Sequence, residues 1–380
     1  MEDRATRARR HEGLDGLRGL AILGVLIFHV WIVRAQWGWW WRHTVEHGAH
    51  GVGLFFAVSA LTLALSWQAR QAVDQQPRWA FWMRRWWRIG PLYYLMLAVY
   101  WGFGVGNPQA APTDHVFTWS NLLAHLTFAF DWIPAAQNSW IGVEWSIGVE
   151  VAFYLAFPWV MAWLAPRTSR PTQVGMLVAA GALGLGWPWL LDRLHGGPWP
   201  SWAEGYPTWT LFAQLPAFAT GLWVWRSRPP QPRWQWAAVL GVVGLWAAVS
   251  LRRWPLSTTA TVWSLPIGAL TWAVWHDLPL LGWLARSPIL RYIGLRSYSW
   301  YLTHWILLLR VVLVWPPAAS GGWSGFAWRL FAALVVTAAA GELGYQLVEK
   351  PGQQVGRYLL RRWGWGPAAQ APPARRTAQG

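Results

Sequence analysis

LDGLRGLAILGVLIFHV, at residues 14–30, is the stretch that decides the fold class. Asp15 and Arg18 stand near its start, ten uncharged residues follow Arg18, and His29 lies deep in the apolar part. On an α-helix, Arg18 and His29 would share one face, about 16 Å apart along the axis. Because an ionisable side chain is costly to bury in a bilayer, His29 is either a functional residue or a packing histidine bonded to a neighbouring carbonyl.

The composition favours one polytopic membrane domain over two or three soluble domains. Of the 380 residues, 55% are hydrophobic and 12% are charged, and apolar runs of membrane-spanning length recur along the chain. The absence of Cys excludes disulfides, thiolate nucleophiles and thiolate metal sites. The net charge of +16 is spread over alternate loops rather than gathered in one patch, so we predict no nucleic-acid partner.

We predict an all-α, multi-pass protein of the inner (plasma) membrane with ten transmembrane helices in the lipid bilayer. Lys and Arg are concentrated in alternate connecting segments, starting with the first, and the positive-inside rule therefore places both termini in the cytoplasm. The predicted spans are 17–33, 48–67, 86–104, 143–165, 173–191, 208–226, 233–251, 257–276, 297–316 and 325–347.

This topology divides the chain into three parts. A basic cytoplasmic segment at 1–13 precedes the transmembrane domain at 14–351, and a basic, Pro/Ala-rich cytoplasmic tail at 352–380 is expected to be disordered at its end. In the outer loop 105–142, TWSNLLAHLTFAFDWIP is too short and polar to span, which predicts a surface or re-entrant helix. The inner segment 277–296 is amphipathic and is expected to lie along the membrane face.

FWMRRWWRIGPLYYL, at residues 81–95, carries three arginines at the predicted cytoplasmic start of the third span. Arg88 is one helical turn from both Arg84 and Arg85, so the three form a cationic fork. Guanidinium groups bind phosphate bidentately, which predicts an anion site here. The alternative is that these arginines serve only topology.

WSIGVEVAFYLAFP, at residues 145–158, places Glu150 at a depth comparable to that of His29. A carboxylate beside an imidazole would hold its tautomer and raise its basicity, as general-base catalysis requires. The alternative is a purely structural His29–Glu150 bond, because charges inside membranes usually pair. Ser146 and Tyr154 lie one turn on either side of Glu150 and are expected to share its pocket.

SYSWYLTHW, at residues 297–305, adds Tyr298, Ser299 and His304, predicted to support substrate or structure. Such side chains also join membrane helices to one another, which is the alternative. Glu342 is predicted to pair with one of the arginines, and VEKP at 348–351 to be a structural end of the last span.

Other catalytic and metal motifs are absent from the sequence. HExxH and Walker A are missing, and Gly51-Val52-Gly53 precedes Ser59 at the wrong spacing for GxSxG. His43, His47 and His50 resemble a metal cluster, but such loop histidines are usually solvated, so we predict no metal.

Taken in order, these stretches resemble the acyltransferase 3 family of membrane-bound O-acyltransferases, over residues 12–351. The matching elements are the opening stretch with its Arg-ten residues-His spacing, RRWWRIGPLYYL, WSIGVEVAFYLAFP, SYSWYLTHW and VEKP. One departure is Val151, which follows Glu150 where many members carry a second acidic residue. It leaves Glu150 as the single carboxylate of that element.

The resemblance implies a ten-helix enzyme that moves an acyl group, usually acetyl from acetyl-CoA or another acyl-CoA, to a hydroxyl of a glycan or other cell-envelope or secreted acceptor. Arg84, Arg85, Arg88 and Arg18 would bind the donor, His29 would deprotonate the acceptor hydroxyl, and Glu150 would orient His29. Attack on the thioester could be direct or follow transfer to a carrier group. No fused esterase-like domain follows in the chain, so transfer is expected to occur alone or with a separate periplasmic partner.

A transporter or flippase for an acylated glycan or lipid is the alternative function. Buried Arg, His and Glu also mark ion and substrate pathways. Against it, the sequence has no paired half-sequence symmetry and no spans broken by Gly or Pro at matching positions.

Overall fold

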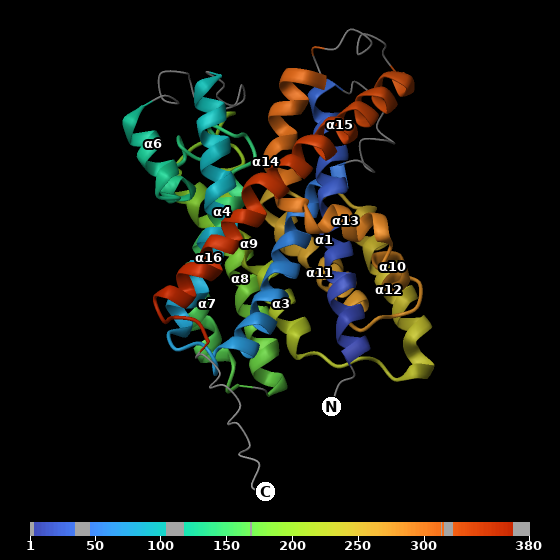
Figure 1. Ribbon diagram of the computed structural model, residues 1–380. Coiled ribbons are helices and arrows are strands. Elements are labelled where there is room, and N and C mark those ends of the chain that lie inside the picture. Colours follow the sequence, from blue (N-terminus) through green and yellow to red (C-terminus); the bar gives the residue numbers. More distant parts are fainter. Residues whose placement is uncertain are drawn as a thin grey trace, which may run out of the picture.

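The structure, a computed structural model, describes residues 4–34, 46–103, 118–167, 169–312, 314 and 322–367. These residues form helices joined by turns and loops, and no strand occurs among them (Figure 1). The all-α prediction is confirmed for this part of the chain.

A helix lies at each of the ten predicted spans: α1 (Arg4–Arg34), α3 (Gly51–Arg70), α4 (Pro77–Gly102), α7 (Trp145–Leu164), α8 (Arg170–His195), α9 (Leu211–Arg226), α10 (Gln235–Ser250), α11 (Leu256–Trp275), α14 (Ser297–Leu307) and α15 (Gly322–Gly344). Five helical ranges are long and apolar enough to cross a membrane: Arg9–Val33, His47–Arg70, Trp145–Leu164, Arg170–His195 and Trp323–Arg362. The chain is therefore a helical membrane protein, and ten crossings stay a prediction.

Local sequence explains why two of the other helices, α4 and α14, are not long and apolar enough to meet this criterion for crossing a membrane. α4 carries arginines in its first half, which lower its hydropathy. α14 ends after 11 residues, where a π-helical turn, Leu308–Val312, takes over.

Shorter helices occupy the two segments predicted to lie along membrane faces. α6 (Trp119–Leu126) and a 3₁₀ turn, Ala129–Trp132, confirm helical structure within TWSNLLAHLTFAFDWIP. α12 (Leu281–Ala285) and α13 (Pro288–Leu295) form the amphipathic segment. The first part of the predicted outer loop, at 104–117, lies outside the described residues.

α1 is the central element, since it packs against α3, α11, α13, α14 and α15. Its contact with α13 depends on glycine. A Cβ at Gly294 would lie 1.7 Å from the carbonyl oxygen of Asp15, and one at Gly19 would lie 2.1 Å from that of Leu290. The two backbones therefore touch, and this contact fixes the turn of α1 that carries Arg18.

The last helix continues beyond the predicted end of the tenth span. A π-helical turn, Tyr345–Glu349, leads into α16 (Lys350–Arg362), which lies against α4. A Cβ at Gly356 would lie 2.7 Å from the Cβ of Trp87, so α16 approaches α4 closely. The chain then returns to the α3–α4 loop, where the amide of Gln75 donates to the carbonyl of Gly366 over 3.2 Å.

The expected tail at 352–380 is thus ordered and packed up to residue 367. Its end, at 368–380, where disorder is predicted, lies outside the described residues. The start of α1 and the end of α16 lie toward the same face of the molecule, and α6 lies toward the opposite face (Figure 1). That the first face is cytoplasmic stays a prediction.

Candidate active site

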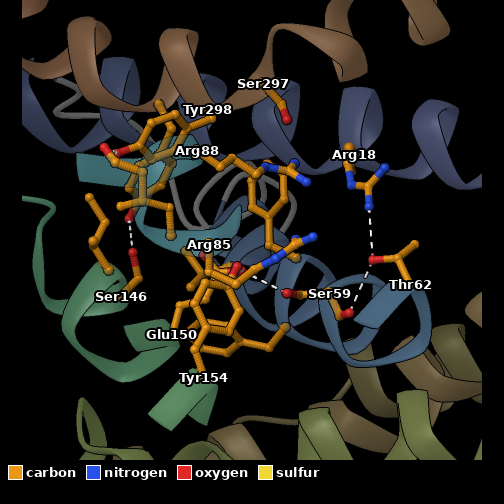
Figure 2. A pocket seen from close by; sticks show the side chains of 16 residues that line it. Arg18, Ser59, Thr62, Arg85, Arg88, Ser146, Glu150, Tyr154, Ser297 and Tyr298 are labelled. Atoms are coloured by element: carbon orange, nitrogen blue, oxygen red, sulfur yellow. Dashed lines mark hydrogen bonds between the residues drawn. The ribbon is translucent and has the colours of Figure 1, made fainter. Parts of the chain in front are cut away.

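A polar cavity of about 70 Å³ lies between α1, α3, α4, α7 and α14. We call it the central cavity (Figure 2). Its charged and polar lining residues are Arg18, Ser59, Thr62, Arg85, Arg88, Ser146, Glu150, Tyr154, Ser297, Tyr298 and Tyr301. Seven of the predicted site residues are thereby brought together from four separate helices.

Arg18 enters the cavity from α1 and is held on two sides. Its guanidinium donates to Asp15 over 2.6 Å. It also donates to the hydroxyl of Thr62 over 3.0 Å (Figure 2). Thr62 in turn donates to the carbonyl of Val58 over 2.9 Å. The support role predicted for Asp15 corresponds to this ion pair, which fixes the direction of Arg18.

Arg85 and Arg88 reach the same cavity from α4 (Figure 2). The guanidinium of Arg85 lies over the rings of Phe81 and Tyr154, 5.8 and 6.0 Å from their centroids, and its buried Nε has no hydrogen-bond partner in the described part of the chain. Neither arginine has a carboxylate within ion-pair distance among the described residues. Two cations placed in this way favour an anionic ligand.

Glu150 accepts hydrogen bonds from two side chains of the cavity. The hydroxyl of Ser59 donates to its Oε1 over 2.7 Å, and the Tyr154 hydroxyl donates to the same oxygen (Figure 2). The predicted contact between Glu150 and His29 does not occur between these two described residues. Similar predicted depth did not bring them together, because the partners of Glu150 are Ser59 of α3 and Tyr154 of its own helix, α7.

The partner of His29 is His304. Nδ1 of His29 lies 3.2 Å from Nε2 of His304, and Nδ1 of His304 lies 2.6 Å from the carbonyl oxygen of Tyr301. A carbonyl oxygen only accepts, so Nδ1 of His304 carries the proton, and Nε2 of the neutral ring is an acceptor. Nδ1 of His29 must therefore donate to it.

The hydrogen bond between the two imidazoles determines which nitrogen of His29 can act as a base. With its proton on Nδ1, a neutral His29 keeps the lone pair on Nε2, the atom that can accept a proton from a substrate. The ring is enclosed by aromatic neighbours, with the Trp305 centroid 5.0 Å away. His304 thus holds the tautomer of His29, the role that the sequence assigned to Glu150.

Tyr301 connects the histidine pair to the central cavity. Its ring lines the cavity, and its centroid is 5.6 Å from that of His304. Its hydroxyl donates to the carbonyl of Val143 over 2.9 Å and lies 2.7 Å from the hydroxyl of Ser146. The predicted residue Ser146 is therefore a neighbour of this tyrosine.

The remaining predicted residues lie around this centre. Tyr298 lines the cavity and donates to the carbonyl of Ile89 over 2.6 Å. Ser299 donates to Glu349 over 2.8 Å. Arg84 points away from the central cavity to an ion pair with Asp74. Glu342 pairs with Arg296, which confirms the predicted carboxylate–arginine pair.

Five polar residues in or beside the site were not predicted as site residues from the sequence, namely Ser59, Thr62, Ser297, Tyr301 and Glu349. Ser59 and Thr62 are the polar residues in the middle of the apolar second span, and this was the available signal. Glu349 was interpreted only as part of a structural terminus, whereas it is buried and bonded to Ser299.

The outer histidines form no metal site within the described residues. No group of three potential ligand side chains occurs there. His47 and His50 pack against Trp263, with ring centroids 4.8 and 4.0 Å away. His43 lies outside the described residues.

Residues 11–341 match a protein family described as an acyltransferase domain. The chain belongs to this acyltransferase 3 family. The match spans the central cavity and both histidines, so these lie in the domain that defines an acyltransferase. The resemblance inferred from the sequence motifs is confirmed, and so is the assignment as an enzyme.

Curated proteins similar to this chain are named as an acyltransferase and as O-acetyltransferases. Acyltransferase MdmB of Streptomyces mycarofaciens is 27% identical, with 96% of each chain covered. Peptidoglycan O-acetyltransferase OatA of Listeria monocytogenes is 25% identical over 92% of this chain and 57% of its own length. A putative O-acetyltransferase of Staphylococcus aureus is 22% identical over 95% of this chain and 60% of its own. No solved structure matches the chain.

Proposed function

We propose that this acyltransferase moves an acyl group, in the simplest case acetyl, from a cytoplasmic acyl-CoA to a hydroxyl of a glycan or other cell-envelope or secreted acceptor. The observation that carries the proposal is a polar cavity with unpaired arginines at one side and the His29–His304 pair next to it. The names of the relatives, an acyltransferase and O-acetyltransferases, support the same reaction class.

The donor end of the reaction is assigned to the arginines. Arg85 and Arg88 would attract the phosphates of the donor, with Arg84 beside them nearer the face where α4 begins. Arg18, held by Asp15 and Thr62, would face the pantetheine arm as it enters the central cavity. The negative charge of Glu150, whose carboxylate is held in place by Ser59 and Tyr154, would limit the repulsion between these cations. This role differs from orienting His29.

The acceptor end is assigned to His29. Its Nε2 would take the proton of the acceptor hydroxyl while the hydroxyl oxygen attacks the thioester carbonyl. The carbon–sulfur bond then breaks, and the CoA thiolate recovers the proton from the imidazolium. His304 would keep Nδ1 of His29 engaged throughout, so that Nε2 is the atom presented to the substrate. We propose direct transfer as the simplest route, since these steps balance without a carrier group.

The proposal is tested by CoA release from acetyl-CoA in the detergent-purified protein. We expect slow release by the wild type, CoA binding without release in His29→Ala, and lost CoA binding in Arg85→Ala/Arg88→Ala. His195→Ala is the matched control, since His195 is exposed, stacks on Trp199 and does not line the central cavity.

Two outcomes would count against the proposal. Undiminished release in His29→Ala would remove that residue from the chemistry. A wild type that neither binds CoA nor releases it from acetyl-CoA would favour a different acyl donor or the transporter alternative.

A further inference from the structure

A second cavity, of about 610 Å³, opens where α3 ends and α16 crosses α4. We call it the arginine cavity, because six arginines line it: Arg70, Arg84, Arg85, Arg88, Arg357 and Arg361. Arg85 and Arg88 also line the central cavity, so the two spaces meet at these residues. Its size is that of a site for a nucleotide-sized ligand.

Half of the six arginines come from outside the motif on α4. Arg70 is the last residue of α3, and Arg357 and Arg361 lie one turn apart on α16. Arg357 and Arg361 lie beyond residues 11–341, which match the family, and beyond the VEKP element at 348–351. The arginines of α16 are therefore a feature of this chain that family membership does not assign.

Specific contacts place α16 at the cavity. Gly356 allows the helix to lie against Trp87, and the returning chain is held where the amide of Gln76 donates to the carbonyl of Trp365 over 3.3 Å. Pro367, which pairs with Asp74, forms part of the cavity wall. Arg357 and Arg361 are thus directed to the same space as the arginines of α4.

The positive charge of the arginine cavity is largely uncompensated. Arg84 pairs with Asp74, and the other five arginines have no carboxylate within ion-pair distance in the part of the chain that the structure describes. The nearby carboxylate of Glu349 accepts hydrogen bonds from Ser299 and Gln353. Like charges gathered in this way repel one another, and a ligand with several negative charges would relieve the repulsion.

We infer that the arginine cavity binds the phosphate groups of the CoA donor, with Arg357 and Arg361 of α16 and Arg70 of α3 as binding residues. This inference rests on the proposed function and adds three residues to it. CoA carries a diphosphate and a separate phosphate on its ribose, which matches arginines arriving from three helices. Its thioester arm would then pass Arg85 and Arg88 into the central cavity.

The test is CoA binding to the full chain in phosphatidylcholine nanodiscs, measured by titration calorimetry. We expect Arg357→Gln/Arg361→Gln to raise the Kd for CoA by about 10- to 30-fold, from two lost charge-assisted contacts. Arg362→Gln is the matched control, because Arg362 is the next residue of α16 and does not line the cavity. Its Kd should stay within about twofold of the wild type. Equal melting temperatures would show that all three proteins are folded.

Three results would overturn the inference: a wild type that does not bind CoA, an unchanged Kd in the double variant, or an equal rise in Arg362→Gln. Anionic lipid headgroups offer the same phosphate chemistry, so the titration is repeated with phosphatidylglycerol in the nanodiscs. If the double mutation changes only the effect of this lipid, the cavity binds lipid instead. A wild type that binds CoA through these residues but releases none from acetyl-CoA would refute the proposed function and leave the binding site standing.

Discussion

At the scale of single residues, the hydrogen bond between His304 and the Tyr301 carbonyl has the largest chemical consequence. Because that carbonyl only accepts, Nδ1 of His304 carries its proton and Nε2 of His304 accepts from Nδ1 of His29. Nε2 of His29 is therefore the basic atom. A carboxylate in the place of His304 would make His29 more basic but would also bring a buried negative charge to its side. The neutral partner orients the base without that charge.

Substitution of His304 tests this positioning role. We expect His304→Leu to lower kcat for acyl transfer by roughly 10- to 100-fold, because His29 loses the acceptor that holds its tautomer. The KM for acetyl-CoA should change little. His304→Gln, whose amide oxygen can accept the same hydrogen bond, should recover most of the rate. Equal rates in the leucine and glutamine variants would show that His304 contributes packing alone.

Asp131, in the predicted outer loop, should make stability depend on pH. It is fully buried, its Oδ2 has no partner in the described part of the chain, and Gln137 donates to Oδ1 over 3.2 Å. Burial raises the pKa of Asp131 from 3.8 to about 7. Between these values the folded protein holds a proton that the unfolded chain has released, so stability falls as pH rises from about 4 to about 7.

Thermal unfolding across this range would measure the effect. We expect the melting temperature of the wild type to fall between pH 4 and pH 7. The corresponding loss in the free energy of unfolding has an upper limit on the order of 4 kcal/mol. Asp131→Asn should flatten the curve and exceed the wild type at pH 7, because the amide is neutral throughout. A wild-type curve that rises over this range, or a variant with the same slope, would contradict the assignment.

The sequence located most of the site residues but not all of their partners. Tyr154 shares a cavity with Glu150 as predicted, and Arg18, Arg85 and Arg88, which were predicted as a donor site, line the same cavity. Hydropathy gives the depth of a residue in the membrane, but which helices are neighbours depends on packing that one sequence does not reveal. For this reason His29 and Glu150, at similar predicted depth, have different partners.

At the scale of helices, the contact between α1 and α13 sets the position of the site. Gly294 allows the backbone of α13 to reach the Asp15 carbonyl, one turn before Arg18. We expect Gly294→Ala to destabilise the protein by about 1–3 kcal/mol, since the new methyl group would overlap backbone that cannot rotate away. CoA release should fall as well, because Arg18 moves with α1.

Gly241 of α10 is the matched control for this substitution. A Cβ there meets nothing within 4 Å, so Gly241→Ala should keep or raise the melting temperature, as alanine favours helix. A comparison of melting temperatures in one detergent would suffice. Similar values for both alanine variants would show that α1 and α13 can separate without cost.

Helix positions followed from the apolar runs, whereas helix ends did not. α4 begins at Pro77, nine residues before the predicted span, because a helix continues through its arginines once Phe81 and Trp82 pack against the bundle. α16 was interpreted as tail, since its composition is polar and basic. Its order comes from contacts with α4 and the α3–α4 loop, which local sequence does not encode.

At the scale of the whole molecule, the proposed reaction requires access from two sides. The arginine cavity lies where α3 ends and α16 crosses α4, toward the face where α1 starts, whereas α6 lies toward the opposite face (Figure 1). The donor would enter from the first face, and the acceptor would reach His29 from the second. This arrangement needs the first face to be cytoplasmic, as the distribution of Lys and Arg predicts.

The cysteine-free sequence allows a direct test of this orientation, because a single substitution introduces the only thiol in the chain. Trp119→Cys places it on α6, where Trp119 is 81% exposed, and Arg362→Cys places it at the end of α16. A membrane-impermeant maleimide should label the first variant in intact cells or spheroplasts and the second only in inverted vesicles. Labelling of both from one side would exclude opposite faces. The reverse pattern would put the arginines on the side that lacks acyl-CoA, and the donor assignment would then fail together with the topology.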